Sequence, residues 1–460
     1  MSGVQNATTQ PVQCIQASVS GSPGLSTSNP FRTRSDVVVG DLISNEDCLF
    51  LNVHVPSNVE RGAQLPVVFW IHSGGYDGGN NSAFPVQDFV KQSNYGVVSV
   101  QVQYRLGLFG FMPGQQVKDG GDLNVGLLDQ QFALQWVQDH IASFGGDPQK
   151  VTIWGQSSGA GSVLQHIVAH GGRTNPPLFR ATIMSSPFLP FQYHYNDPIP
   201  EMLYAEVVAQ VNCTGSSDTL ACLRAANASD LVQADTAIGS ANFLGTYTFV
   251  PVVDEEFIVE RPTETLNRLQ VNGETLLAIT NSHEGDLFVN ATAVTSANLT
   301  LAEYVTQLFP RLNHTQVQHA VGLYSRIGLQ TVVEQAEAVM GDSIFVCPAY
   351  YALEGYGRGG WKGEFAIPPG THAEDLSYEF ITFAIRPTYN NTAFINAFSE
   401  SFMSFAISLD PNVHVDPSDI KPTWATWGLN STEMLFNKTE SGVPVVQPFE
   451  TDAGLLERCQ

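Results

Sequence analysis

Short apolar runs bounded by Gly, Pro and Asn recur along the chain and predict buried β-strands, because a strand that is covered on both faces needs no polar alternation. These runs lie at 49–56, 66–72, 96–104, 151–155, 181–185 and 276–280. We interpret all six as parallel strands of one sheet.

A segment of helical period lies between the third and the fourth of these runs. In residues 129–143 the apolar side chains from Phe132 to Ile141 form one broad stripe at helical spacing. The sequence FGGDP at 144–148 then ends the helix, since Gly supplies a C-cap and Pro prevents continuation. Strand, helix and strand with short turns predict an open, mostly parallel α/β sheet.

The rest of the chain fits one domain. Residues 286–350 look largely helical and predict a cap over one end of the sheet. The sequence contains no internal repeat, no low-complexity tract and no long Pro/Ser linker. We therefore expect residues 1–460 to form a single α/β domain with embedded insertions.

The composition allows a large core and excludes two classes of partner. Of the 460 residues 43% are hydrophobic, and 20 Lys and Arg against 44 Asp and Glu give a formal net charge of −24. Such an acidic surface repels nucleic acids and anionic lipid headgroups, whose binding needs clustered cations. No apolar run reaches the roughly 20 residues of a transmembrane helix, so we expect no stable membrane insertion.

The cysteines and the N-x-S/T sequons indicate whether the protein is secreted or stays inside the cell. The six cysteines are Cys14, Cys48, Cys213, Cys222, Cys347 and Cys459. None forms a CxxC pair and no Walker pattern occurs, so we expect neither a metal site nor a cofactor. Sequons occur at Asn6, Asn80, Asn212, Asn227, Asn290, Asn298, Asn313, Asn390, Asn430 and Asn437. Roughly four would be expected from composition, and the excess favours a secreted glycoprotein.

The first residues do not agree with that interpretation. MSGVQNATTQPVQ has neither a basic n-region nor an apolar h-region, so it is not a signal peptide. Two explanations stay open: the numbering omits an N-terminal piece, or the protein is not secreted.

The strongest chemical signal is the pattern G-x-S-x-G at 155–159, between the strand run 151–155 and a helical pattern. A nucleophilic serine on a strained strand-to-helix turn needs small residues two positions before and after it. The following helix directs its positive end at a developing oxyanion. The bare pattern also arises by chance in glycine-rich loops, but this context favours Ser157 as a nucleophile.

A glycine-rich turn, HSGGY at 72–76, follows the second strand run. Backbone N–H groups converge on one oxygen only where side chains do not crowd the approach. An ordinary strand-end turn is the alternative, and the neighbouring serine motif favours an oxyanion hole at Gly74 and Gly75.

Further blocks resemble the type-B carboxylesterase/lipase family of α/β-hydrolases, which includes cholinesterases and fungal lipases. In the family's order they are EDCLFLNV (46–53), YRLG (104–107), NVGLLDQ (124–130), FGGDP (144–148), FVPVVD (249–254) and CP (347–348). The match runs from about residue 11 to the C-terminus. It implies an α/β-hydrolase fold, with a mostly parallel central sheet flanked by helices and helical cap insertions.

The resemblance also implies two partners for Ser157. The family's acid stands in a D-E-G-x-x-F block, which matches HEGDLF and points to Glu284; its base stands in an H-x-x-D/E-L-x-Y block, which matches HAEDLSY and points to His372. The order Ser157, Glu284, His372 agrees with the nucleophile, acid and base order of this fold. Among 44 acidic residues and 11 histidines, neither could be chosen without the family.

In that family the base removes the serine proton, the acid holds the imidazole tautomer, and water hydrolyses the acyl-serine. The oxyanion would be bound by the backbone N–H groups of Gly74, Gly75 and Ser158. Arg105 and Asp129 match a structural ion pair of the family, and Ser185 matches a serine that supports the acid.

By family position the disulfides would join Cys14 to Cys48, Cys213 to Cys222 and Cys347 to Cys459. The first would close the loop 15–47, which forms a lid or gorge wall in relatives. This loop is rich in Ser, Gly, Thr and Pro rather than amphipathic, which argues against lipase-like interfacial activation.

The sequence departs from the family at the site and at its start. Ser73 replaces a glycine, Gln156 replaces a glutamate and thereby removes a negative charge beside Ser157, and Ser158 replaces an alanine. The family's N-terminal β-segment and its G-I-P block have no counterpart, so we expect the natural protein to be longer, with a signal peptide upstream.

Two functions remain open. The first is a secreted serine hydrolase that cleaves carboxylic esters, with a small-molecule or lipid ester as substrate. The second is a catalytically silent adhesion or binding protein of the same fold, a class that typically loses the nucleophile. Survival of all three triad positions favours the enzyme, and Gln156 argues against a cationic choline substrate.

Overall fold

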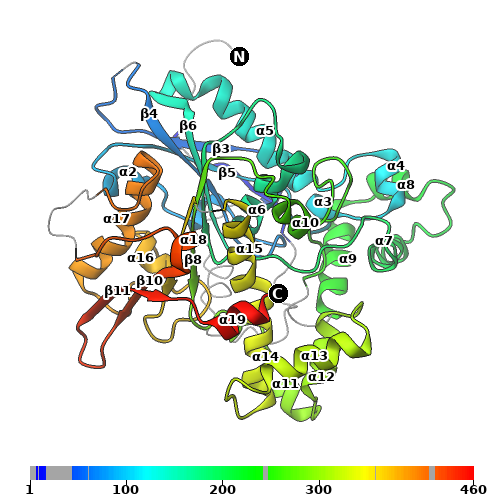
Figure 1. Ribbon diagram of the computed structural model, residues 1–460. Coiled ribbons are helices and arrows are strands. Elements are labelled where there is room, and N and C mark those ends of the chain that lie inside the picture. Colours follow the sequence, from blue (N-terminus) through cyan, green and yellow to red (C-terminus); the bar gives the residue numbers. More distant parts are fainter. Residues whose placement is uncertain are drawn as a thin grey trace.

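A nine-stranded sheet runs through the centre of the molecule (Figure 1). The computed structural model describes residues 7–8, 10–16, 44–60, 62–241, 247–357, 359–413 and 420–460. From edge to edge the strands are β11 (Pro444–Glu450), β10 (Thr432–Lys438), β9 (Gly360–Phe365), β8 (Thr275–Asn281), β7 (Ala181–Ser185), β6 (Gly146–Gln156), β4 (Leu65–Ile71), β5 (Val98–Val102) and β3 (Leu51–His54). A short parallel pair, β1 (Gln13–Cys14) and β2 (Ser44–Asn45), forms a separate sheet.

All neighbouring strands from β10 to β5 are parallel, as the sequence predicts for β4 to β8. The first predicted strand is the exception, because β3 pairs antiparallel with β5. Its residues Leu51–His54 are only half-buried, since β3 lies at the sheet edge. The interpretation of 49–56 as a buried parallel strand is therefore wrong.

The strands β9, β10 and β11 were not predicted, because polar residues interrupt their apolar pattern. Lys362 in β9 is buried and bonds to Glu433 of β10, with 3.0 Å between Nζ and Oε2. The pair neutralises two charges that would otherwise exclude both segments from a core. A strand that contains such polar residues therefore lacks the apolar pattern of a buried strand and is predicted as a surface loop.

Eighteen helices in the described part of the chain surround the sheet. They are α2 (Gln87–Gln92), α3 (Gly107–Phe111), α4 (Gln115–Gly120), α5 (Val125–His140), α6 (Ser158–Gly172), α7 (Pro198–Gln210), α8 (Thr219–Ala225), α9 (Ala228–Ala241), α10 (Pro262–Asn267), α11 (Ala291–Ser296), α12 (Leu301–Leu308), α13 (His314–Tyr324), α14 (Val332–Gly341), α15 (Cys347–Gly355), α16 (Leu376–Glu379), α17 (Thr392–Ser408), α18 (Trp427–Asn430) and α19 (Ala453–Arg458). None of these described helices is both long and apolar enough to cross a membrane.

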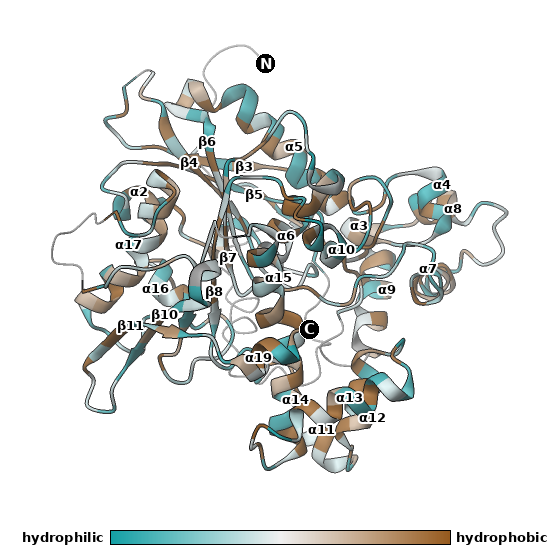
Figure 2. Cartoon of the chain, in the orientation of Figure 1, coloured by the Kyte–Doolittle hydropathy of each residue, from teal (hydrophilic) through white to brown (hydrophobic). Residues whose placement is uncertain are grey.

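Successive side chains along each strand point to opposite faces of the sheet, so the core is divided into two layers. In β4, Val67, Phe69 and Ile71 pack on the face that α5, α6 and α15 cover. Val68 and Trp70 point to the opposite face, where α2, α16 and α17 pack. Figure 2 shows the matching pattern outside, where hydrophobic and hydrophilic residues alternate along outer helices such as α5 and α13.

The helical predictions agree with the structure in outline. The helix predicted at 129–143 is α5, which begins earlier, at Val125, and ends in a 3₁₀ turn over Ile141–Phe144. The segment 286–350 forms α11 to α14, a π-helical turn at 342–346 and the start of α15. The helices α11 to α14 lie together outside the sheet (Figure 1). A capping box opens α12, where Thr300 and Glu303 each bond to the other's backbone N–H.

The structure contains the three disulfides that the family resemblance implies. Cys14 bonds to Cys48, Cys213 to Cys222, and Cys347 to Cys459. The last ties α15 to the end of α19. Residues 17–43 of the predicted lid loop lie outside the described residues.

A buried carboxyl joins α9 to α3. Asp235 is 3% exposed, and its Oδ2 accepts a hydrogen bond from Leu108 N at 3.0 Å. Burial raises the pKa of Asp235 to about 7, and the Leu108 N–H opposes the rise only in part. Removal of its carboxyl from water and, next, the charge of Asp235 raise the pKa of the half-buried Asp77.

We predict that this carboxyl makes the fold less stable as the pH rises. A carboxyl whose pKa is raised on folding binds more protons in the folded than in the unfolded state between about pH 4 and 7, so its contribution is lost over that window. In Asp235→Asn, which keeps an oxygen acceptor for Leu108, the thermal midpoint should fall less between pH 5 and pH 8. Asp139→Asn, on the exposed side of α5, is the matched control. A midpoint difference between wild type and Asp235→Asn that stays constant with pH would contradict the assignment.

Candidate active site

The predicted nucleophile lies on a sharp turn between β6 and α6. Ser157 has φ 56° and ψ −124°, a backbone conformation that is strained for any residue with a side chain. A Cβ atom on Gly155 would lie 2.3 Å from the backbone carbon of Gly159, and one on Gly159 would lie 2.2 Å from Ile71 O. The turn therefore requires glycine at both positions, which is the physical basis of the motif.

The close approach of Gly159 to Ile71 also joins this turn to the loop after β4. In that loop Gly74 and Gly75 both have positive φ, and Gly78 N donates to Gly74 O at 3.0 Å. Ser158 begins α6 directly beside it. The structure thus brings the three predicted N–H donors to the same edge of the sheet.

Two contacts hold the loop after β4 from outside. Tyr104 Oη donates to His72 O at 2.8 Å, and the two rings stack with centroids 4.3 Å apart. The Gln16 amide donates to Gly79 O at 2.9 Å and accepts from Gly79 N at 3.2 Å. Since Gln16 is two residues from the Cys14–Cys48 disulfide, that bridge anchors the segment that clamps the loop.

Glu284 and His372 meet beside the turn. The distance from His372 Nδ1 to Glu284 Oε2 is 2.5 Å, and both residues are 2% exposed. They follow β8 and β9, which are adjacent parallel strands, and His283 N bonds to Gly370 O between the two loops. Carboxyl ends of parallel strands meet at one edge, so residues far apart in sequence converge here.

The second oxygen of Glu284 is also bonded. Its Oε1 accepts from Ser186 Oγ at 2.5 Å and from Asn281 N at 2.6 Å. A carboxylate taken out of water needs such partners, so these two donors fix its position.

Ser185 does not support Glu284 directly, contrary to the expectation from the family. Its Oγ donates instead to Glu379 Oε1 at 2.5 Å. Ser185 is the last residue of β7, and the next residue, Ser186, turns out of the strand with φ 53° and thereby reaches Glu284. Sequence reasoning missed Ser186, and the doubled serine at the strand end was the only signal for it.

Further acids lie behind Glu284. Burial raises the pKa of Asp375 to about 6, and burial and the charge of Asp375 raise the pKa of Glu379. The negative charge of each carboxyl disfavours a second one so close to it, and burial favours the neutral form of both. Asn281 Nδ2 donates both to Asp375 Oδ1 at 3.0 Å and to Ser186 Oγ at 3.1 Å, so it links this pair to the Glu284 carboxylate.

The imidazole of His372 lies in an aromatic slot. Phe345 and Phe288 flank it at centroid distances of 4.4 and 5.0 Å. The amide nitrogen of the fully buried Gln156 lies 3.3 Å from His372 Nε2. The departure from the family at position 156 thus places a neutral side chain against the base.

The predicted ion pair is also present. Arg105 Nη2 lies 2.7 Å from Asp129 Oδ1, and Arg105 Nε donates to Oδ2 at 2.8 Å. This bidentate pair joins the residues after β5 to α5 and makes no contact with the three triad positions in the described structure.

Comparison with known proteins identifies the family. The profile of the Carboxylesterase family matches residues 1–447. Lipase 4 of Diutina rugosa is 31% identical over 401 residues, which cover 81% of this chain and 71% of that lipase. The secreted triacylglycerol lipase LIP1 of Gibberella zeae is 29% identical over 446 residues, which cover 90% and 74% of the two chains.

A solved structure agrees in fold. EstA of Aspergillus niger superposes with a TM-score of 0.81 at 27% sequence identity, over 91% of this chain and 84% of that one. The central sheet with its flanking helices is therefore an α/β-hydrolase fold. The chain belongs to the carboxylesterase family and is a carboxylic ester hydrolase.

Proposed function

We propose that this chain hydrolyses neutral carboxylic esters through an acyl-serine intermediate, with Ser157 as nucleophile, His372 as base and Glu284 as the acid that orients it. The observation that carries the proposal is the 2.5 Å bond between His372 Nδ1 and Glu284 Oε2 at the sheet edge where β6 turns at Ser157. With Nδ1 donating to the carboxylate, Nε2 is left as the acceptor for the serine proton.

In the first half-reaction Ser157 Oγ forms a bond to the ester carbonyl carbon while His372 Nε2 takes its proton. The N–H groups of Gly74, Gly75 and Ser158 stabilise the tetrahedral oxyanion. The positive end of the α6 dipole adds to this electrostatic stabilisation. Collapse of the tetrahedral intermediate breaks the bond between the carbonyl carbon and the alcohol oxygen, and this oxygen receives the proton from His372. Water then repeats the sequence on the acyl-serine and releases the carboxylic acid.

A neutral substrate fits the surroundings of the base. The imidazole lies between Phe288 and Phe345, and the neighbouring Gln156 carries no charge. These three side chains offer no negative charge to replace the hydration of a cationic ester, whereas an apolar acyl group has no charge to desolvate.

We propose an extracellular location. Every sequon asparagine in the described part of the chain is exposed or half-buried, as glycosylation requires. Three disulfides fit an oxidising compartment, and a relative that matches 90% of the chain is named a secreted lipase.

The first test is Ser157→Ala. Hydrolysis of p-nitrophenyl butyrate should fall by about 10⁴- to 10⁶-fold, because the three triad groups act as a unit. Ser296→Ala, an exposed serine at the end of α11, is the control and should keep full activity. Undiminished turnover in Ser157→Ala would refute the assignment, and inactive wild-type protein would favour the silent binding protein.

The second test separates the two adjacent serines. Ser186→Ala removes one of the two bonds to Glu284 Oε1, and loss of a hydrogen bond to a charged group should lower kcat by about 10-fold or more, with little change in KM. Ser185→Ala removes a bond to Glu379 instead and should have a smaller effect on kcat. A larger loss of kcat in Ser185→Ala than in Ser186→Ala would show that the acid depends on the other serine.

A further inference from the structure

Two acidic side chains behind the triad have no part in the proposed mechanism. Asp375 directly precedes α16 and Glu379 is its last residue, and both residues are 0% exposed. Residues four positions apart lie on the same face of a helical turn, which brings their carboxyls side by side. Two neighbouring carboxyls in a protein interior are tolerated only when their oxygens are hydrogen-bonded.

Each of these carboxyls has one oxygen with a donor and one without. Asp375 Oδ1 accepts from Asn281 Nδ2 at 3.0 Å, and Glu379 Oε1 accepts from Ser185 Oγ at 2.5 Å. The other two oxygens, Asp375 Oδ2 and Glu379 Oε2, are buried and meet no donor in the part of the chain that the structure describes. One proton between them would turn two unsatisfied acceptors into a single O–H···O hydrogen bond.

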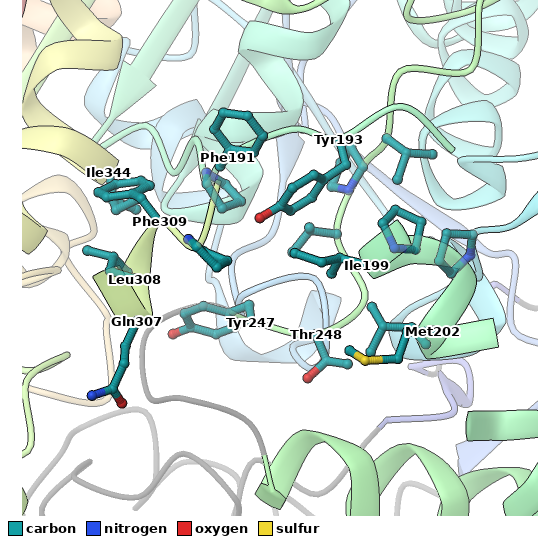
Figure 3. Close-up of a pocket in the computed structure, with 18 residues that line it drawn as sticks. Phe191, Tyr193, Ile199, Met202, Tyr247, Thr248, Gln307, Leu308, Phe309 and Ile344 are labelled. Atoms are coloured by element: carbon teal, nitrogen blue, oxygen red, sulfur yellow. The ribbon is translucent and has the colours of Figure 1, made fainter. Parts of the chain in front are cut away.

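Two cavities of ligand size lie elsewhere in the molecule. Figure 3 shows an apolar cavity of about 390 Å³, whose lining includes Phe191, Tyr247 and Phe309. A larger cavity of about 690 Å³ shares Phe191 and Phe309 with it. Asp375 and Glu379 line neither of them. A ligand in these cavities would therefore not reach the two oxygens, and a shared proton is the simplest way to satisfy both.

The electrostatic surroundings assign this proton to Glu379. Burial raises the pKa of Asp375 to about 6. Burial and, next, the charge of Asp375 raise the pKa of Glu379 well above its ordinary value of 4.5. As the pH rises, Asp375 is therefore the first of the two to ionise, and Glu379 keeps its proton at neutral pH.

The charged and titratable groups around the pair belong to the triad. The charge of Glu284 raises the pKa of Asp375, and a protonated His372 opposes this rise. The remaining neighbours lie on β6, β7 and α2 and do not titrate: Trp154, Ser185 and Gln92. The pair is therefore coupled electrostatically to the groups whose position it can influence.

Asn281 connects the pair to the triad acid. Its amide nitrogen donates both to Asp375 Oδ1 and to Ser186 Oγ, which lies 3.1 Å away. Ser186 in turn donates to Glu284 Oε1 at 2.5 Å. A carboxylate that holds one end of this chain of hydrogen bonds thereby helps to orient the donor that Glu284 needs.

We propose that Glu379 is a positioning residue that stays protonated in the active enzyme and donates a hydrogen bond from Oε2 to Asp375 Oδ2. This bond holds Asp375 where it accepts from Asn281, and thereby holds the chain of hydrogen bonds to Glu284. Loss of the proton at alkaline pH leaves two adjacent carboxylates, whose repulsion disturbs the chain and lowers kcat. The inference rests on the proposed triad and names a residue on which the position of its acid depends.

The first test detects the proton directly by infrared spectroscopy. A protonated carboxyl has a higher carbonyl stretching frequency than a carboxylate, so wild type minus Glu379→Gln at neutral pH should contain the band of a protonated acid. Labelling of glutamate carboxyls with carbon-13 should shift this band, which separates Glu379 from Asp375. Glu374→Gln, the same change at the half-buried residue before Asp375, is the control and should lack the band. A difference spectrum in which Glu379 contributes only a carboxylate would contradict the proposal.

The second test is the pH dependence of kcat with p-nitrophenyl butyrate. In the wild type kcat should fall at alkaline pH, when the pair loses its proton. Glu379→Gln carries a donor that cannot ionise, so it should keep kcat at neutral pH and retain it at alkaline pH. Glu379→Leu has no donor and should lower kcat at neutral pH by about 10-fold, with little change in KM. Glu374→Gln should follow the wild-type profile.

The third test measures stability and needs no activity. A carboxyl whose pKa is raised on folding stabilises the folded state less as the pH rises above its unfolded value, near 4.5. The thermal midpoint of Glu379→Gln should therefore rise relative to that of the wild type as the pH is increased from 4.5. A difference in midpoint that does not change with pH would show that Glu379 is ionised in the fold.

Two kinetic results would overturn the positioning role. The first is a Glu379→Gln variant that loses kcat at alkaline pH as the wild type does. The second is a Glu379→Leu variant that has both the wild-type kcat and a cooperative thermal transition. If Glu379→Leu does not fold, the profile of Glu379→Gln alone decides.

Failure of the proposed triad gives a different signature. If Ser157→Ala retains hydrolysis, the acyl-serine mechanism is wrong whatever the variants of Glu379 do. The infrared band and the thermal midpoint still decide in that case whether Glu379 carries the proton. If Ser157→Ala is inactive while kcat does not respond to the Glu379 variants, only the positioning role fails.

Discussion

A carboxylate buried in a protein interior is stable only when its oxygens are hydrogen-bonded, and Glu284 meets this condition on both of them. One oxygen bonds to His372 and the other to Ser186 and to the Asn281 backbone. The orientation of the imidazole is therefore set by a carboxylate that two other donors hold in place. The proposed chemistry depends on this contact, because Nε2 is the ring nitrogen that can accept a proton when Nδ1 donates to the carboxylate.

Glu284 is not an isolated carboxylate, because two further acidic side chains lie close to it. Asp375 and Glu379 lie behind it, and burial raises the pKa of both. Asn281 donates hydrogen bonds to Asp375 and to Ser186, and Ser186 in turn donates a hydrogen bond to the Glu284 carboxylate. Raised pKa values favour the neutral forms of these two acids, which limits the negative charge behind the base.

Different parts of the site could be predicted to different degrees. Ser157 follows from local steric rules, since Gly155 and Gly159 are required by contacts of 2.3 and 2.2 Å within and beside the turn. Glu284 and His372 were reached only through the family resemblance, because their proximity depends on the adjacency of β8 and β9 and not on spacing in the sequence.

The elements that sequence reasoning missed share a physical cause. The strands β9 and β10 carry the buried Lys362–Glu433 pair, and its compatibility with a core appears only when both partners are in place. Ser186 took the role expected of Ser185 because a positive φ after β7 reverses the alternation of side chains.

The central claim is that Ser157 is the residue that becomes acylated, and covalent trapping tests it most directly. The wild-type protein would be incubated with a p-nitrophenyl alkylphosphonate, and the digested protein analysed by peptide mass spectrometry. The account predicts one phosphonyl adduct per chain, on Ser157, formed in proportion to the loss of ester hydrolysis and strongly slowed in His372→Ala. An adduct on another residue, or hydrolysis that persists while Ser157 is fully labelled, would contradict it.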